Sequence, residues 1–151
     1  MEKRIFTKYK LQLVKESAGK YEVDKKITCP RDVKEVLINV VNLHLECEEV
    51  FILITLDTKN VVNGIFEVSR GVLNSALIHP REVFKRAILQ NSNSIMVAHN
   101  HPSEDTTPSK EDINITQRLI ESGKILGIEV LDHIIIGNEL KYLSFKEKGL
   151  L

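Results

Sequence analysis

His99, His101 and Asp112 are residues whose types and spacing could together bind a metal ion. The two histidines are separated by one residue and follow the apolar run Ile95–Ala98, which predicts a strand. In an extended chain alternate side chains share a face, so both imidazoles can approach one cation. Ligands of nitrogen, nitrogen and oxygen type leave a fourth tetrahedral position for water, which is typical of catalytic rather than structural zinc. The sequence therefore predicts a zinc site that could activate water.

Each of these residues also has a simpler explanation. An isolated histidine at the end of a strand more often bonds a backbone carbonyl than a metal. Ser109 and Asp112 fit a capping box, which would explain both residues by helix initiation alone. Thr107 followed by Pro108 is an equally good helix start, and Asp112 would then lie one turn inside the helix, available to a metal. The joint spacing of the three residues favours the metal site.

The complete spacing, His-x-His, seven residues, Ser, two residues, Asp, resembles the JAMM motif of the JAB/MPN-domain metalloproteases. Within that superfamily, the sequence His99-Asn-His-Pro-Ser103 followed by Pro108-Ser109 is similar to the RadC family of bacterial proteins. The likeness runs from about Leu37 to the C-terminus. It implies a zinc-dependent hydrolase that cleaves a peptide or isopeptide bond, with Zn²⁺ held by the two histidines and the aspartate.

The resemblance also implies roles for two further residues. JAMM enzymes use a glutamate from an earlier strand to hold the water and transfer its proton, and Glu49 matches that position relative to Asp57. Glu46 and Glu48 are the other candidates, and we expect Glu48 to be an ordinary exposed charge. Ser109 would donate a hydrogen bond to the oxyanion.

Two features depart from the RadC pattern. Longer RadC proteins carry a helix-hairpin-helix region before this domain, and residues 1–30 are too short and too strand-like to form one, so we expect it to be absent. The family usually has glycine where this chain has Glu104. Glycine permits a positive φ that glutamate resists, so we expect an altered loop without the loss of a ligand.

The pair Asp132-His133 interrupts an apolar strand. Such a pair could support the metal site, because carboxylates often orient ligating imidazoles. By alternation, however, only one of the two can share the face of Leu131. We therefore favour a structural role for the pair.

The pattern of apolar residues predicts the elements that position these side chains. Val50–Leu56 is apolar on both faces and belongs in the middle of a covered sheet. Helices are expected at Pro30–Leu45, Pro80–Gln90 and Ser109–Gly123, with Gly123 as the C-cap. Further strands are expected at Ile5–Lys15, Tyr21–Val23, Val61–Val68, Ile95–Ala98, Ile128–Ile136 and Tyr142–Phe145, with a connector at Gly71–Ile78. This order predicts an α/β (α+β) fold, a mixed β-sheet flanked by helices, as the resemblance implies for the JAB/MPN (cytidine-deaminase-like) architecture.

Length and composition limit the remaining possibilities. A chain of 151 residues suits one domain, spanning residues 1–151. Lys plus Arg and Asp plus Glu number 21 each, so the net charge is zero and strong direct binding to nucleic acid is not expected. The sequence has no membrane span or signal core, and Cys29 and Cys47 are predicted to be free thiols, so we expect a cytoplasmic protein that acts on a peptide or protein substrate. The alternative is a non-catalytic module that works with DNA-repair or mobile-element proteins.

Overall fold

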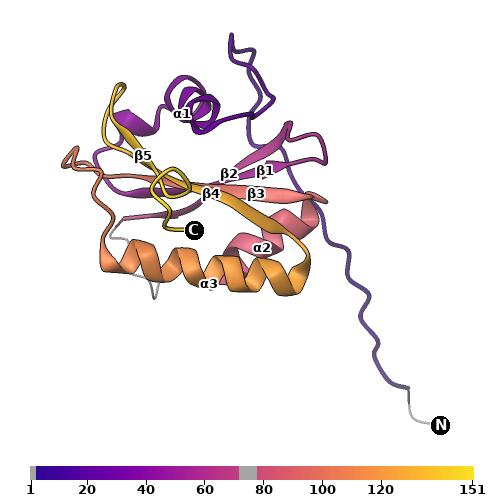
Figure 1. Ribbon diagram of the computed structural model, residues 1–151. Coiled ribbons are helices and arrows are strands. Elements are labelled where there is room, and N and C mark those ends of the chain that lie inside the picture. Colours follow the sequence, from indigo (N-terminus) through magenta and orange to yellow (C-terminus); the bar gives the residue numbers. More distant parts are fainter. Residues whose placement is uncertain (1–2, 72–77) are drawn as a thin grey trace.

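The computed structural model describes residues 3–71 and 78–151, so most of the expected connector, residues 72–77, lies outside the described residues. Within these ranges five strands form one mixed sheet in the order β2-β1-β3-β4-β5 (Figure 1). The strands are β1 (Val50–Leu56), β2 (Val62–Arg70), β3 (Ser94–Asn100), β4 (Glu129–Ile136) and β5 (Tyr142–Ser144). The helices are α1 (Pro30–Asn39), α2 (Pro80–Leu89), α3 (Lys110–Leu126) and the short 3₁₀ helix η1 (Leu43–Leu45). The predicted α+β fold is confirmed.

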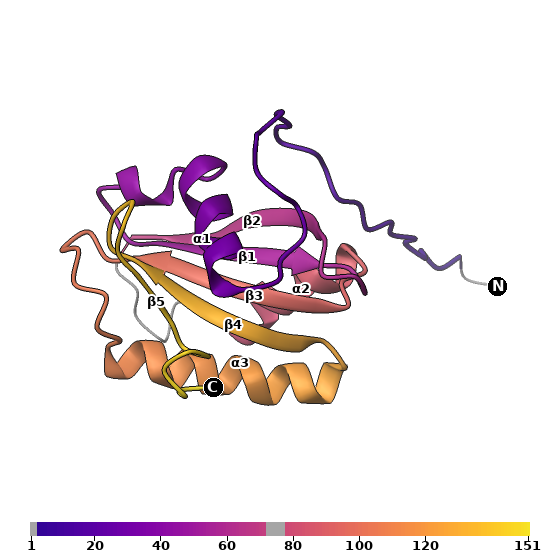
Figure 2. The same cartoon turned by 45° about the horizontal axis from the view of Figure 1, so that its top comes forward.

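Helices cover both faces of the sheet. Figure 1 and Figure 2 show α1 on one face and α2 and α3 on the other. The central strands β1 and β3 are buried along their whole length, as expected for strands covered on both sides. Alternate side chains enter two separate cores, with Ile52 and Ile54 on the α1 face and Phe51 and Leu53 on the α2/α3 face. Among the described residues no helix is both long enough and apolar enough to cross a membrane.

The connections between strands bring one end of β3 and one end of α3 to the same edge. β1 is antiparallel to both β2 and β3, whereas β3 and β4 are parallel. Parallel neighbours require a crossover, and α3 supplies it. The chain leaves β3 immediately after His99 and Asn100 and enters α3 at Lys110. The polar loop between them therefore lies at the edge where the sheet ends.

The two strands predicted in the N-terminal region are not formed. Residues 3–20 have neither helix nor strand, and the segment runs away from the body of the molecule (Figure 1). The predicted strand Tyr21–Val23 is a bend, and only Lys26 forms an isolated bridge, with Val61. The large apolar side chains of the segment are exposed: Ile5, Phe6, Tyr9, Leu11 and Val14. The alternation of apolar and polar residues in Ile5–Lys15 was not enough to form a strand, because strand formation depends on a neighbouring strand and on packing.

The first helix is shorter than predicted. α1 begins at Pro30 with Cys29 as the N-cap, and Asp32 in its first turn reaches back to accept hydrogen bonds from the N–H groups of Cys29 and Thr28. It ends at Asn39 because the chain then turns through Asn42, which has a φ of 56°. The short η1 follows in place of the last predicted turn of the helix.

The last helix is longer than predicted. α3 continues through Gly123 to Leu126, and Gly127, with a φ of 70°, is the C-cap. Gly123 has a different purpose, because a Cβ at this position would overlap the carbonyl oxygen of Ile128. Its hydrogen in place of a side chain lets the helix approach the start of β4 closely.

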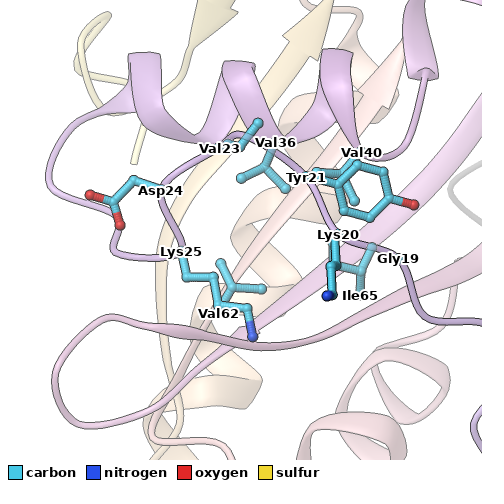
Figure 3. A pocket seen from close by; sticks show the side chains of 10 residues that line it. All are labelled: Gly19, Lys20, Tyr21, Val23, Asp24, Lys25, Val36, Val40, Val62 and Ile65. Atoms are coloured by element: carbon cyan, nitrogen blue, oxygen red, sulfur yellow. The ribbon is translucent and has the colours of Figure 1, made fainter.

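An apolar hollow of about 440 Å³ lies on the α1 face (Figure 3). It is bounded by α1, β2 and residues 19–25, and its apolar lining includes Tyr21, Val36, Val40, Val62 and Ile65. Val36 belongs to the core of the α1 face and Ile65 packs against it. The hollow is therefore separated by the sheet from any site on the α2/α3 face.

Candidate metal centre

β3 and the residue that follows it carry the two histidines. His99 pairs across the sheet with Phe51 of β1 and is fully buried on the α2/α3 face. His101 comes after the end of β3, where its N–H donates to the carbonyl oxygen of Ile136 (2.9 Å). The His101 side chain remains 12% exposed. The two imidazoles lie on one side, as the alternation of an extended chain predicts, and His101 is the one nearer to solvent.

Asp112 approaches the histidines from the first turn of α3. Ser109 is the N-cap of this helix, because its Oγ accepts from the N–H of Asp112 (3.1 Å), and Asp112 Oδ2 accepts from the N–H of Ser109 (2.8 Å). The alternative start, with Thr107 as the cap, is wrong, since the helix begins at Lys110. Capping does not exclude metal binding, because each carboxylate oxygen can accept more than one bond. The same carboxylate faces both the cap and the histidines.

The three candidate ligands converge on one point. His99 Nε2 lies 2.9 Å from His101 Nε2 and 3.2 Å from Asp112 Oδ1. His101 Nε2 lies 3.4 Å from Asp112 Oδ2, and one ligand atom from each residue lies within 4.8 Å of the others. Ligands that bind zinc tetrahedrally at roughly 2.0–2.1 Å are about 3.3 Å apart. The donor atoms and their spacing therefore fit a zinc-sized ion.

The charges of this cluster depend on one another. Although burial raises the pKa of the Asp112 carboxyl group, the adjacent imidazoles of His101 and His99 outweigh it and hold the pKa well below its usual range. The hydrogen bond to Asp112 in turn raises the pKa of His101, against the lowering effect of burial. In the metal-free site the imidazole of His101 thus stays protonated to a higher pH than an ordinary imidazole. A metal ion would have to displace a proton from His101.

The outer nitrogens of the two rings also have partners. His101 Nδ1 donates to the backbone carbonyl of Asp105 (2.5 Å). His99 Nδ1 lies 2.8 Å from Nε2 of His133 in β4, and His133 Nδ1 lies 2.6 Å from Oγ1 of Thr116 in α3. His133 is completely buried, and burial lowers its pKa well below the usual value. The ring of His133 therefore contacts His99 through Nδ1, the nitrogen that does not face His101 and Asp112.

A β-bulge explains why sequence reasoning did not place His133 at the site. Strict alternation along β4 would put His133 on the face of Leu131. The pairs Ile95–Val130 and Met96–Asp132, however, leave Leu131 as one extra residue in β4. Leu131 and Asp132 consequently both line a second, separate hollow beside the start of α1. Every later side chain of β4 lies on the face opposite to the one that strict alternation would give it. The bulge turns His133 toward His99.

Asp132 has the structural role predicted for the pair. Its carboxylate accepts hydrogen bonds from the Ser144 hydroxyl (2.5 Å), the N–H of His133 (2.8 Å) and the N–H of Lys146 (3.0 Å). These bonds fasten β5 and the turn after it to β4. The pair Asp132-His133 is therefore divided, with the carboxylate on one face of the sheet and the imidazole on the other.

Glu49 lies just before β1, at the register position of His101. Phe51 faces His99 in the β1–β3 ladder, so the residue two positions before Phe51 falls opposite the residue two positions after His99. The hydrogen bond to Asp112 is the main cause of the raised pKa of His101, and the negative charge of Glu49 adds to it. The negative charge of Glu49 therefore acts on the ring of His101.

The other two candidate glutamates have different surroundings. Glu46 forms an ion pair with Arg70 (2.6 Å), and this bond lowers the pKa of Glu46. The Glu48 side chain is exposed and lies over Gly71, where an added Cβ would be 3.9 Å from its Oε2. The predicted assignment of Glu48 as an exposed charge is consistent with this position.

Ser109 and Glu104 lie on the solvent side of the cluster. Ser109 is exposed, and its cap uses the oxygen as an acceptor, which leaves the hydroxyl hydrogen for another acceptor. Glu104 has a φ of 62°, so this glutamate adopts the left-handed conformation that the expected glycine would adopt without strain. Its carboxylate accepts a hydrogen bond from Asn138 (2.9 Å). The loop turns sharply here, and His101 and Asp112 still converge.

Comparison with known proteins identifies a family. A family model described as "RadC-like JAB domain" matches residues 27–150. A "UPF0758 protein" of Clostridium beijerinckii is 53% identical over 128 residues, which cover 85% of this chain and 55% of that protein. Proteins of the same name from Desulfitobacterium hafniense and Clostridium botulinum are 52% and 55% identical over 125 and 126 residues, in each case 83% of this chain and 54% of the relative. The chain thus spans about half the length of the curated relatives it matches.

Proposed function

Since the chain belongs to the family of RadC-like JAB domains, we propose that it is a zinc-dependent hydrolase that cleaves a peptide or isopeptide bond. The observation that most supports this proposal is the convergence of His99, His101 and Asp112. Two imidazoles and one carboxylate leave a fourth tetrahedral position, as in catalytic zinc sites. The position of Glu49 beside His101 adds a group that can move a proton.

Each residue has a distinct role in this proposal. His99 and His101 would hold the ion through Nε2, and Asp112 would hold it through its carboxylate. A zinc ion held by these residues would lower the pKa of a water toward neutrality and polarise the substrate carbonyl. Glu49 accepts the proton of the attacking water and passes it to the leaving amine. Ser109 donates the hydroxyl hydrogen that its cap does not use to the oxyanion of the substrate.

The exposure of the site restricts how a substrate can reach it. The side chains of His99, His101 and Asp112 are 0%, 12% and 6% exposed, so the cluster opens on the side of His101. Ser109 is exposed and Glu49 is half-buried, and both belong to segments at that edge of the sheet. A peptide bond in an extended segment fits this approach, because a long chain can lie across an edge without entering an enclosed cavity.

The proposal is tested by measuring zinc and hydrolysis on the same preparation. Protein purified without a histidine tag is analysed by mass spectrometry for zinc and incubated with a mixture of internally quenched peptides and with a peptide branched through a lysine isopeptide bond. We expect one zinc per chain and cleavage of at least one substrate, with both lost in Asp112→Ala. Zinc without any cleavage would favour the alternative, a non-catalytic module that works with DNA-repair or mobile-element proteins. Tight, strongly salt-dependent binding to duplex DNA would favour the same alternative.

A further inference from the structure

We propose that Thr116 and His133 are positioning residues that fix the ring tautomer of His99, so that Nδ1 carries the hydrogen and Nε2 is left for the metal. The inference rests on the proposed metal site and adds two residues to it. It follows from the direction of three consecutive hydrogen bonds, which run from the backbone of Asp112 to the ring of His99.

The first hydrogen bond in this series is made by Thr116. Its Oγ1 lies 2.6 Å from the carbonyl oxygen of Asp112 and 2.6 Å from Nδ1 of His133. A hydroxyl has one hydrogen, and a carbonyl oxygen can only accept. If the hydrogen pointed to His133, two oxygens would face each other at 2.6 Å in a buried site. The Thr116 hydrogen therefore points to Asp112, and His133 Nδ1 donates to Thr116.

The surroundings of His133 determine the charge of its ring. Its ring is 0% exposed, stacks on Phe145 with centroids 4.6 Å apart and meets Phe51 edge-on at 5.7 Å. Its two nitrogens face a hydroxyl and an imidazole rather than a carboxylate. An imidazolium in such surroundings is unfavourable, so the ring is neutral and has one N–H. Because Nδ1 carries that hydrogen, Nε2 is a bare acceptor.

The contact with His133 determines which nitrogen of His99 carries the hydrogen. Its Nδ1 lies 2.8 Å from the bare Nε2 of His133, and a contact of this length between two nitrogens requires a hydrogen. Only His99 can supply it. His99 Nδ1 is therefore the permanently protonated nitrogen, and Nε2, which faces His101 and Asp112, is the one that can be vacated for a metal. Metal ligands must be deprotonated at the binding atom, so the series of bonds selects the binding form of His99 in advance.

The two histidines thus obtain the same orientation by different means. His101 donates from Nδ1 to a backbone carbonyl, which is a common way to orient a ligating imidazole. His99 depends on side chains from β4 and α3. Thr116 lies one turn after Asp112 in α3, so one helix provides both a metal ligand and the origin of the series. A change at Thr116 should therefore affect metal binding although Thr116 contacts none of the atoms that would bind the metal.

The test uses Thr116→Val, which removes the hydroxyl and keeps the shape of the side chain. Zinc affinity, measured by competition with a chromophoric chelator, should fall roughly 10–100-fold, the range typical for residues that orient metal ligands. In metal-free protein, ¹⁵N NMR of the histidine rings should show His99 protonated at Nδ1, and Thr116→Val should weaken this preference. Thr116→Ser retains the hydroxyl and should restore both properties.

Thr55→Val is the matched control. Thr55 is also fully buried and its hydroxyl donates to Asn63 (2.6 Å), on a part of the sheet remote from the cluster. This variant should lose stability and keep its zinc affinity. Equal losses of affinity in the Thr55 and Thr116 variants, or no loss in Thr116→Val, would overturn the inference.

The NMR measurement separates this inference from the proposed function. If the wild-type protein binds no zinc, the proposed site fails, and the tautomer of His99 still decides whether the hydrogen-bond series exists. If Thr116→Val does not fold, the wild-type spectrum decides, because His99 protonated at Nε2 rather than Nδ1 in metal-free protein would contradict the inference.

Discussion

The two faces of the sheet differ in how their cores end. On the α1 face, β3 contributes the apolar side chains of Met96 and Ala98, and β1 contributes apolar side chains along its whole length: Val50, Ile52, Ile54 and Leu56. On the α2/α3 face, the same strands contribute Leu53 and Val97 and then end in Phe51 and His99. The same two strands therefore contribute to an apolar core on one face and to the candidate metal site on the other. Which one a residue joins depends on the strand period of two.

This difference shows that an apolar hollow and a candidate metal site need not coincide. The apolar hollow of about 440 Å³ lies on the α1 face (Figure 3), whereas the convergent His and Asp side chains lie across the sheet from it. The α2/α3 face accommodates polar groups because each has a partner: His133 with Thr116, and Asp112 with Ser109. Substitutions on the two faces should consequently have different effects.

The largest effect on activity is expected at Glu49. Glu49→Gln preserves size and hydrogen-bonding capacity but removes the basic carboxylate, so kcat should fall by roughly 10²–10⁴, the usual contribution of general acid–base catalysis. Zinc content and fold should persist. The matched variant Glu48→Gln should hydrolyse at the wild-type rate. Loss of activity in Glu48→Gln instead would mean that the strand register at this edge is shifted by one residue.

The opposite pattern is expected on the α1 face. Leu37 is fully buried there, and Leu37→Ala should reduce the free energy of unfolding by about 2–5 kcal/mol through lost burial and a residual cavity. Zinc affinity of the folded variant should equal that of the wild type, because the sheet separates Leu37 from the ligands. Denaturant unfolding and chelator competition measure the two quantities. A large loss of zinc affinity in this variant would show that the two faces are coupled.

Zinc affinity should also depend on pH through His101. The hydrogen bond to Asp112 raises the pKa of His101 in the metal-free protein, so this ring stays protonated at a higher pH than an ordinary imidazole. Zinc must displace that proton, and affinity should fall about tenfold per pH unit once the pH drops below the raised pKa. Competition titrations between roughly pH 8 and pH 6, corrected for the chelator, test this. Affinity that is constant over this interval would contradict the proposed proton displacement.

The smallest effect is expected in the loop between the two histidines and α3. Glu104→Gly removes the strain of a glutamate at a φ of 62°, but it adds conformational freedom to the unfolded chain and removes the bond with Asn138. These contributions oppose one another, so the free energy of unfolding should change by less than about 1 kcal/mol. Thermal unfolding measures the change. A strong loss of stability would mean that Glu104 contributes more than this turn and its bond explain.

The sequence was sufficient to bring His99, His101 and Asp112 together as candidate ligands, and insufficient to show which residues lie behind them. His99, His101 and Asp112 were found from spacing, because alternation in a strand and a helix start are local properties. The position of His133 beside His99 depends on one extra residue in β4, and no local pattern marks where that residue is inserted. The strand predicted at Ile5–Lys15 failed for a related reason, since alternation does not reveal whether a partner strand exists.

The proposed function depends above all on one metal ion held by His99, His101 and Asp112. Mass spectrometry of untagged protein, together with His101→Ala and His99→Ala, tests it most directly. We expect one zinc per chain in the wild type and its loss in both variants, because two ligands of this kind do not retain the ion that three hold. Zinc content that is unchanged in both variants, or a wild-type protein that takes up no zinc when loaded, would contradict the site.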